Sequence, residues 1–136
     1  MSEHERSRTV AALPEVVFEQ ASDVGQIDTW LPRELHVRPG EPPGVTVHDD
    51  DTGRDAEALL RARRDQLRLE WGTREDARYG GWLQVEGIGG GASQVTVHLS
   101  FFDEGHAPAD NEVTVALDES LDRLAEQVRL RADRAG

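Results

Sequence analysis

Two β-forming segments separated by glycines constrain the fold more than any other part of the chain. They cover residues 82–88 and 94–102, and the stretch 89–93 between them is rich in glycine. Glycine tolerates the positive φ angles of tight hairpin turns. On the second segment, apolar side chains alternate with polar ones: Val95, Val97, Leu99 and Phe101 lie on one face, and Thr96, His98 and Ser100 on the other. This pattern predicts a β-hairpin with one buried face.

A helical pattern occupies the C-terminal part of the chain. Its apolar side chains recur at helical spacing: Leu117, Leu121, Leu124 and Val128. Arginines near its end complement the negative end of a helix dipole. Upstream, Val113 and Val115 are β-branched and disfavour a helix. We therefore expect a long amphipathic helix that begins near Asp118.

The sequence of residues 1–48 predicts short strands and short helices. Residues 8–12 are β-prone, and Pro14 suits the first position of a helix over 14–20 because its missing N–H would have had no partner there. Ser22 or Asp23 caps a second short helix, which ends at Pro32. Brief strands are then expected over 35–38 and 45–48, on either side of a cluster of proline and glycine.

Residues 55–71 fit two structures. Their alanine, leucine, arginine and glutamate content favours a helix. The same residues also alternate as two strands, Ala58 to Ala62 and Leu67 to Trp71, on either side of a turn at residues 64–66. Strand context commonly overrides local propensity. We therefore predict a second hairpin here.

Length and charge limit the class of protein. A chain of 136 residues fits a single domain, 1–136. Its formal charge of −12 and pI of about 4.7 disfavour binding to nucleic acid or to an anionic membrane. No segment approaches the roughly 20 apolar residues of a membrane span, and the polar residues 1–8 do not resemble a signal peptide. We expect a cytoplasmic protein.

The sequence predicts no metal site and no cofactor. Cysteine is absent, which excludes thiolate ligands and cysteine nucleophiles. Asp49, Asp50 and Asp51 follow His48 but lack the spacing of a calcium loop. The other histidines show no paired spacing of the kind that binds zinc on a helix. The glycines at 87–91 lie between two strands, whereas a phosphate-binding loop joins a strand to a helix.

The order of these elements resembles the SRPBCC superfamily, also called START-like, which includes polyketide cyclase/dehydrase proteins and relatives of the birch-pollen allergen. Three segments resemble family features, namely the entry to the first helix, the exit from the second, and a middle strand: residues 12–18 (ALPEVVF), 28–32 (DTWLP) and 67–71 (LRLEW). Residues 117–128 resemble the family's final helix. The resemblance spans nearly the whole chain.

The resemblance implies an α+β helix-grip fold. In this fold an antiparallel sheet of about seven strands wraps around a long C-terminal helix, and two short helices follow the first strand. It also implies a cavity between sheet and helix, where members hold apolar or amphipathic molecules and some direct the cyclisation of polyketides. No catalytic set of residues transfers by motif.

Six residues are candidates for ligand binding in such a cavity. Three are large aromatic side chains that can pack against a flat ligand: Trp30, Trp71 and Trp82. We expect Trp30 to close the mouth of the cavity and Trp82 to face it from the long hairpin. Three more could orient a carbonyl or move a proton: Arg78, Tyr79 and His98.

Three functions remain open from the sequence. The first is binding of a small hydrophobic or aromatic molecule. The second is catalysis of the aromatase/cyclase type, for which no acid/base pair is assured. The third is an interaction module that presents an apolar patch to another protein or to a second copy of the chain, as a homodimer. Whether the protein is an enzyme is not decided by the sequence.

Overall fold

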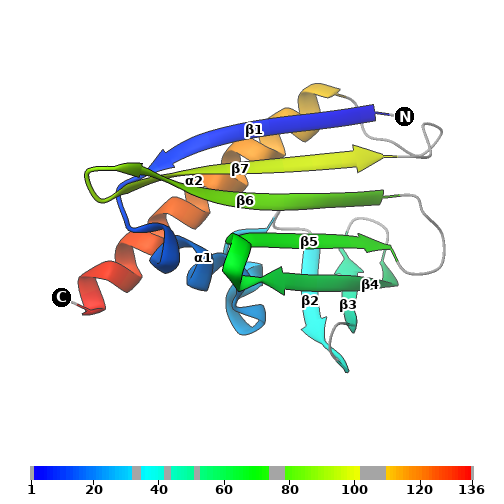
Figure 1. Ribbon diagram of the computed structural model, residues 1–136. Helices are drawn as coiled ribbons and strands as arrows, with labels where there is room; N and C mark the ends of the chain where they lie inside the picture. The colour runs from blue at the N-terminus through cyan, green and yellow to red at the C-terminus, as the bar shows by residue number, and fades with distance from the viewer. Residues whose placement is uncertain are drawn as a thin grey trace.

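Seven antiparallel strands form one sheet in the order β1-β7-β6-β5-β4-β3-β2 (Figure 1). The computed structural model describes residues 2–31, 35–41, 44–50, 53–73, 79–101 and 110–135. The strands are β1 (Ser2–Val10), β2 (Leu35–Pro39), β3 (Gly44–Asp49), β4 (Arg54–Arg63), β5 (Arg68–Thr73), β6 (Tyr79–Gly89) and β7 (Ala92–Phe101). The helices are α1 (Pro14–Ser22), η1 (Val24–Thr29), η2 (Arg64–Gln66) and α2 (Asp110–Ala135). This is the predicted helix-grip arrangement.

Both predicted hairpins are confirmed. Strands β6 and β7 pair with Leu83 opposite Val97, and three glycines with positive φ close their turn. Strands β4 and β5 pair with Leu60 opposite Trp71, so residues 55–71 are not a helix. The β4–β5 turn is the short 3₁₀ helix η2, followed by Leu67 in the left-handed conformation. Burial outweighs helix propensity here, because Leu69 is fully buried.

Helix α2 begins at Asp110, so the expected start near Asp118 is wrong. Val113 and Leu117 are both buried and extend the apolar stripe toward the beginning of the helix. Their burial offsets the modest helix penalty of a β-branched side chain. Within the described residues, no helix is long and apolar enough to cross a membrane.

Strand β1 is longer than predicted and begins at Ser2. It pairs with β7 along its whole length, from Ser2 opposite Phe101 to Val10 opposite Ser93. Two arginines on its inner face form ion pairs with α2, Arg6 with Asp118 at 2.9 Å and Arg8 with Asp122. The inner face of β1 therefore carries polar side chains that pair with the helix, which is why the sequence shows no apolar alternation there.

The core lies between α2, α1 and the inner face of the sheet. In Figure 1, α2 runs across the part of the sheet formed by β1, β7 and β6, and its strongest contacts are with β1, α1 and η1. We define the inner face by the buried side chains of β5, β6 and β7: Leu69, Leu83, Val85, Val95 and Val97. Because side chains alternate along a strand, the strand register assigns every other residue to one of the two faces.

Candidate functional site

An apolar row crosses the inner face of four strands. Leu60, Trp71, Gly81 and Leu99 are successive partners on β4, β5, β6 and β7. Trp71 and Leu99 lie two residues from the buried Leu69 and Val97, so they share the inner face with them. Leu60, Trp71 and Leu99 pack against the core but remain partly exposed. The row therefore offers apolar surface on the side of the sheet that faces α2.

Gly81 makes the centre of this row flat. A Cβ atom at this position would lie 2.5 Å from the carbonyl oxygen of His98 and 2.7 Å from Nε1 of Trp71. Neither distance is compatible with a side chain, so the Trp71 indole lies directly against the backbone of β6. The result is an aromatic side chain packed closely against β6 on the inner face.

Trp30 is part of the core. Its side chain is 2% exposed and belongs to the same hydrophobic cluster as Leu69 and Leu83. Arg123 of α2 donates to the carbonyl oxygens of Trp30 and Leu31, which fixes the segment that follows η1. Trp30 therefore closes the core at η1. Its role in ligand binding stays a prediction.

In the described part of the chain, the buried side-chain polar atoms without a hydrogen bond include one in the residue after η1 and one on α2. These two atoms are Nε1 of Trp30 and Oγ of Ser120. Buried polar atoms usually have a partner, since leaving one unpaired costs free energy. Both atoms are thus available to a hydrogen-bonding group that enters the interior.

Trp82 and His98 lie on the outer face, which corrects the expectation that Trp82 faces the cavity from the long hairpin. They are partners across β6 and β7, in the opposite alternation to the buried Leu83 and Val97. Their rings stack at 5.2 Å, and the guanidinium of Arg68 lies 4.6 Å from the Trp82 ring. His98 also contacts Glu5 at 3.2 Å and Ser100 at 3.1 Å. Neither side chain points toward α2.

Arg78 lies outside the described residues. Tyr79 is the first residue of β6, and its side chain is likewise not described. The assignment of these two residues to the site stays a prediction.

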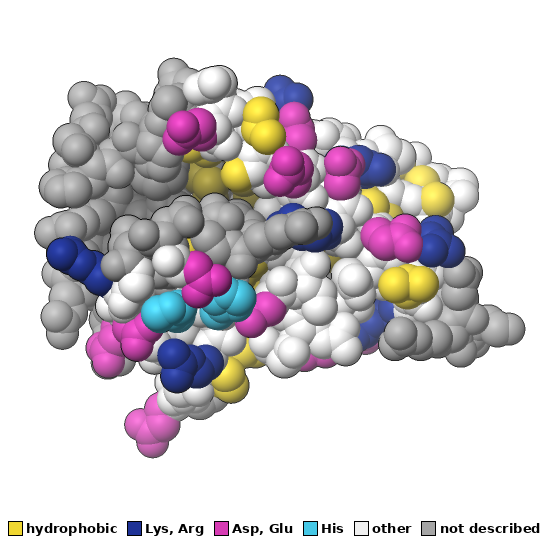
Figure 2. Space-filling model, turned by 180° about the vertical axis from the view of Figure 1, so that it is seen from behind, with side chains coloured by type: hydrophobic (Ala, Val, Ile, Leu, Met, Phe, Trp, Pro, Cys, Tyr) yellow, Lys and Arg dark blue, Asp and Glu magenta, His cyan; other side chains and the backbone are white. Residues whose placement is uncertain are grey.

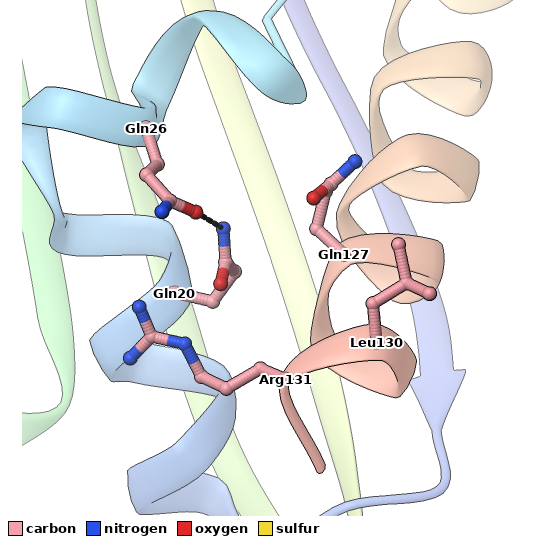
Figure 3. Close-up of a pocket in the computed structure, with 5 residues that line it drawn as sticks. All are labelled: Gln20, Gln26, Gln127, Leu130 and Arg131. Carbon is pink, nitrogen blue, oxygen red and sulfur yellow. Dashed lines mark hydrogen bonds between the residues drawn. The ribbon is translucent and has the colours of Figure 1, made fainter. Parts of the chain in front are cut away.

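A small pocket lies between α1, η1 and α2 (Figure 3). It has a volume of about 80 Å³ and is lined by Gln20, Gln26, Gln127, Leu130 and Arg131. Gln20 is 1% exposed, and its Nε2 donates to Oε1 of Gln26 at 2.9 Å. Ligand pockets for drug-sized molecules measure about 300–1,000 Å³, so this polar pocket suits a few water molecules instead.

Two histidines and three aspartates form a continuous chain at the β2 edge of the sheet, which we call the histidine–aspartate chain. Its order is Asp28, His36, Asp50, His48 and Asp55. The successive distances are 3.7 Å, 2.7 Å, 3.4 Å and 2.6 Å between ring nitrogens and carboxylate oxygens. Figure 2 shows histidine and acidic side chains gathered on this part of the surface. In the described part of the chain, no group of three or more such residues has the arrangement of a metal site.

Sequence reasoning missed this group because it tested the histidines only for helical spacing. The signal was present: His36 lies three residues before the proline–glycine cluster and His48 four residues after it, and the structure pairs them across β2 and β3. In an antiparallel hairpin, residues at mirrored positions become neighbours.

Solved structures with the same fold share little sequence with this chain. XoxI from Bacillus cereus has a TM-score of 0.75 at 18% identity, with 94% of this chain and 96% of that chain covered. The Zhui aromatase/cyclase from Streptomyces sp. R1128 has a TM-score of 0.74 at 15% identity, with 99% and 98% covered. BexL, a two-domain aromatase/cyclase of the BE-7585A biosynthetic pathway, has a TM-score of 0.72 at 17% identity; 96% of this chain matches 47% of BexL. These likenesses show the fold.

The sequence itself matches one family model over most of its length. No curated protein sequence matches the chain. The model described as "Polyketide cyclase / dehydrase and lipid transport" matches residues 1–129. This range includes the seven described strands, the three short helices α1, η1 and η2, and most of α2. The chain therefore belongs to the polyketide cyclase/dehydrase and lipid transport family.

Proposed function

We propose that this protein binds a small hydrophobic or aromatic molecule between the inner face of the sheet and α2. The observation that carries the proposal is the apolar row, whose side chains Leu60, Trp71 and Leu99 stay partly exposed on that face. Burial of apolar surface is favourable by roughly 25 cal/mol per Å². A ligand that covers this row would gain that free energy.

Two further features define the ligand. The Trp71 indole packs closely against β6 at Gly81 and stays partly exposed, so it can contact a planar ring. The formal charge of −12 disfavours an anionic molecule. The proposed ligand is therefore uncharged, apolar and at least partly planar. The family description, which includes lipid transport, supports an apolar ligand.

A cyclase-type reaction on a polyketide-like substrate is the second proposal. It is favoured by the family description and by the likeness to the Zhui aromatase/cyclase. Such a reaction needs a proton donor or acceptor at the inner face. His98 does not meet this requirement, because it lies on the outer face. Arg78 and Tyr79 remain as candidates.

An interaction module has less support. Among the described residues, the large apolar side chains with the greatest exposure are Leu13, Ile88 and Val115, which lie before α1, on β6 and on α2. A homodimer stays a prediction.

Replacing Trp71 by alanine is expected to weaken ligand binding about tenfold, because an aromatic contact contributes about 0.5–1.5 kcal/mol and 1.4 kcal/mol is a factor of ten in affinity. The measurement is fluorescence titration with the uncharged probe N-phenyl-1-naphthylamine. Leu60→Ala, in the same row, should weaken binding in the same direction. Trp82→Ala is the matched control, since it removes the same side chain from the outer face, and should leave affinity unchanged.

Circular dichroism and urea unfolding of each variant separate a loss of binding from a loss of folding. Equal effects of Trp71→Ala and Trp82→Ala would contradict the proposed location. Absence of probe binding by the unaltered protein, together with no retained small molecule in native mass spectrometry, would refute the binding function.

A further inference from the structure

The histidine–aspartate chain connects four separate parts of the fold. Asp28 belongs to η1, His36 to β2 and His48 to β3, Asp50 follows β3, and Asp55 belongs to β4. Each imidazole lies between two carboxylates: His36 between Asp28 and Asp50, and His48 between Asp50 and Asp55. With both imidazoles protonated, the charges alternate along the chain. With both neutral, three carboxylates remain without a cation among the five members.

Protonation of His36 is favoured by its surroundings. The hydrogen bond to Asp50 is the main cause that raises the pKa of His36, and the charges of Asp50 and Asp28 add to it. A raised pKa in the folded state means that the stabilisation is fully present below the ordinary histidine value of about 6.5. It is lost as the pH rises through the raised value. The contacts of His36 with Asp50 and Asp28 are therefore strongest below about pH 6.5 and weaken as the pH rises through the raised pKa.

Of the two carboxylate contacts that depend on this proton, the shorter is with Asp50, and the longer, with Asp28, lies between η1 and the edge strand β2. Asp28 is shared: its Oδ1 accepts the backbone N–H of Val37 at 2.8 Å, and its Oδ2 lies 3.7 Å from Nδ1 of His36. A second polar contact of this segment is made by Arg123 of α2, which donates to the carbonyl oxygens of Trp30 and Leu31. An arginine keeps its charge at every physiological pH. One attachment thus titrates with histidine and the other does not.

We propose that His36 is a proton-operated latch that holds η1 against β2, and that its deprotonation loosens this side of η1. The segment after η1 carries the buried Trp30. Loosening η1 would expose the interior from the β2 side, and so a neutral His36 would speed the entry and release of a bound molecule. Only the predicted effect on ligand entry and release rests on the proposed function.

Amide hydrogen exchange at Val37 tests the latch without any ligand. Exchange is measured between pH 5 and pH 8, the range in which histidine titrates, and corrected for intrinsic exchange. We expect protection of this amide to fall several-fold with rising pH in the unaltered protein. His36→Arg, which keeps a positive charge, should stay protected across the range. His36→Gln, which has none, should be weakly protected at every pH.

His98→Gln is the matched control, because His98 also contacts carboxylates, those of Glu3 and Glu5, but lies on the outer face of β7, away from η1. In the His98→Gln variant, the Val37 amide should show the same protection at each pH as in the unaltered protein. The same pH dependence in His36→Gln as in the unaltered protein would overturn the latch. So would an ordinary or lowered pKa of His36 in an NMR titration.

Stopped-flow release of N-phenyl-1-naphthylamine then tests the link to binding. Release should accelerate with pH in the unaltered protein and be independent of pH in His36→Arg. If the probe does not bind at all, the proposed function fails while the exchange data still decide the latch. If exchange depends on pH and release does not, the control of ligand access is refuted.

Discussion

Replacing Leu124 by alanine is expected to lower the free energy of unfolding by about 3 kcal/mol, within the range of about 2–5 kcal/mol found for buried leucines. Leu124 is 1% exposed and lies in the middle of the α2 stripe that packs against the sheet. Its removal loses the burial of the side chain and leaves a cavity where close-packed neighbours relax only partly. Urea unfolding followed by circular dichroism measures this change.

Val115→Ala on the same helix is the control. Val115 is 56% exposed, so its removal costs little burial, and alanine has the higher helix propensity. We expect a change within about 0.5 kcal/mol of zero. A loss of similar size in both variants would show that α2 does not pack on the sheet through the predicted stripe.

Gly81→Ala is the second large effect, with an expected loss of about 2 kcal/mol or more, in the range of about 1–3 kcal/mol for overpacking. The new methyl group would lie 2.5 Å from the carbonyl oxygen of His98, which is backbone and cannot turn aside, and 2.7 Å from Trp71. Both β7 and the indole must shift. Tryptophan fluorescence and near-UV circular dichroism should therefore change together with the stability measured by urea unfolding.

Gly87→Ala tests the same substitution on the same strand. A Cβ at Gly87 would lie 3.4 Å from Cγ of Pro14, an ordinary contact. We expect a change of no more than about 0.5 kcal/mol and no spectral shift. If Gly81→Ala proved equally harmless, the indole of Trp71 would not pack closely against the β6 backbone, and its proposed place in the binding surface would be contradicted.

The two hairpins were predictable because apolar and polar residues alternate along their strands, and this alternation indicates that one face of each strand is buried. The choice of strands over residues 55–71 went against helix propensity and is confirmed by the pairing of Leu60 with Trp71. The length of β1 could not be read in the same way. Its inner face carries Arg6 and Arg8, whose partners Asp118 and Asp122 lie on the other end of the chain. A polar inner face produces no apolar alternation.

The beginning of α2 was misjudged for a related reason. Val113 and Val115 have low helix propensity, so the local sequence disfavoured a helix there. The burial of Val113 depends on contacts with other parts of the fold, which a single segment of sequence does not reveal. In such cases, burial in the folded protein outweighs local helix propensity.

The candidate site was predicted only in part. Trp71 lies on the inner face as a cavity residue requires, whereas Trp82 does not. The sequence contained the signal for Trp82, because it shares its alternation with Gln84 and Glu86, while Leu83 and Val85 form the apolar set. Residue type alone, a large aromatic side chain, was given more weight than strand parity. The open space that a ligand needs depends on rotamers and layer distances, which no sequence pattern encodes.

Because β1 pairs with β7, it cannot take its place in the sheet until β7 has been synthesised. Val10 pairs with Ser93, and α2 follows later still, so the first strand waits for most of the polypeptide to be made. At the usual rate of about 5–20 residues per second, a ribosome needs several seconds to reach the partner strand. During this delay, the arginines and glutamates of β1 discourage it from joining the edges of other nascent chains. The charged side chains of β1, two of which form ion pairs with α2 in the folded protein, thus also disfavour aggregation of the nascent chain.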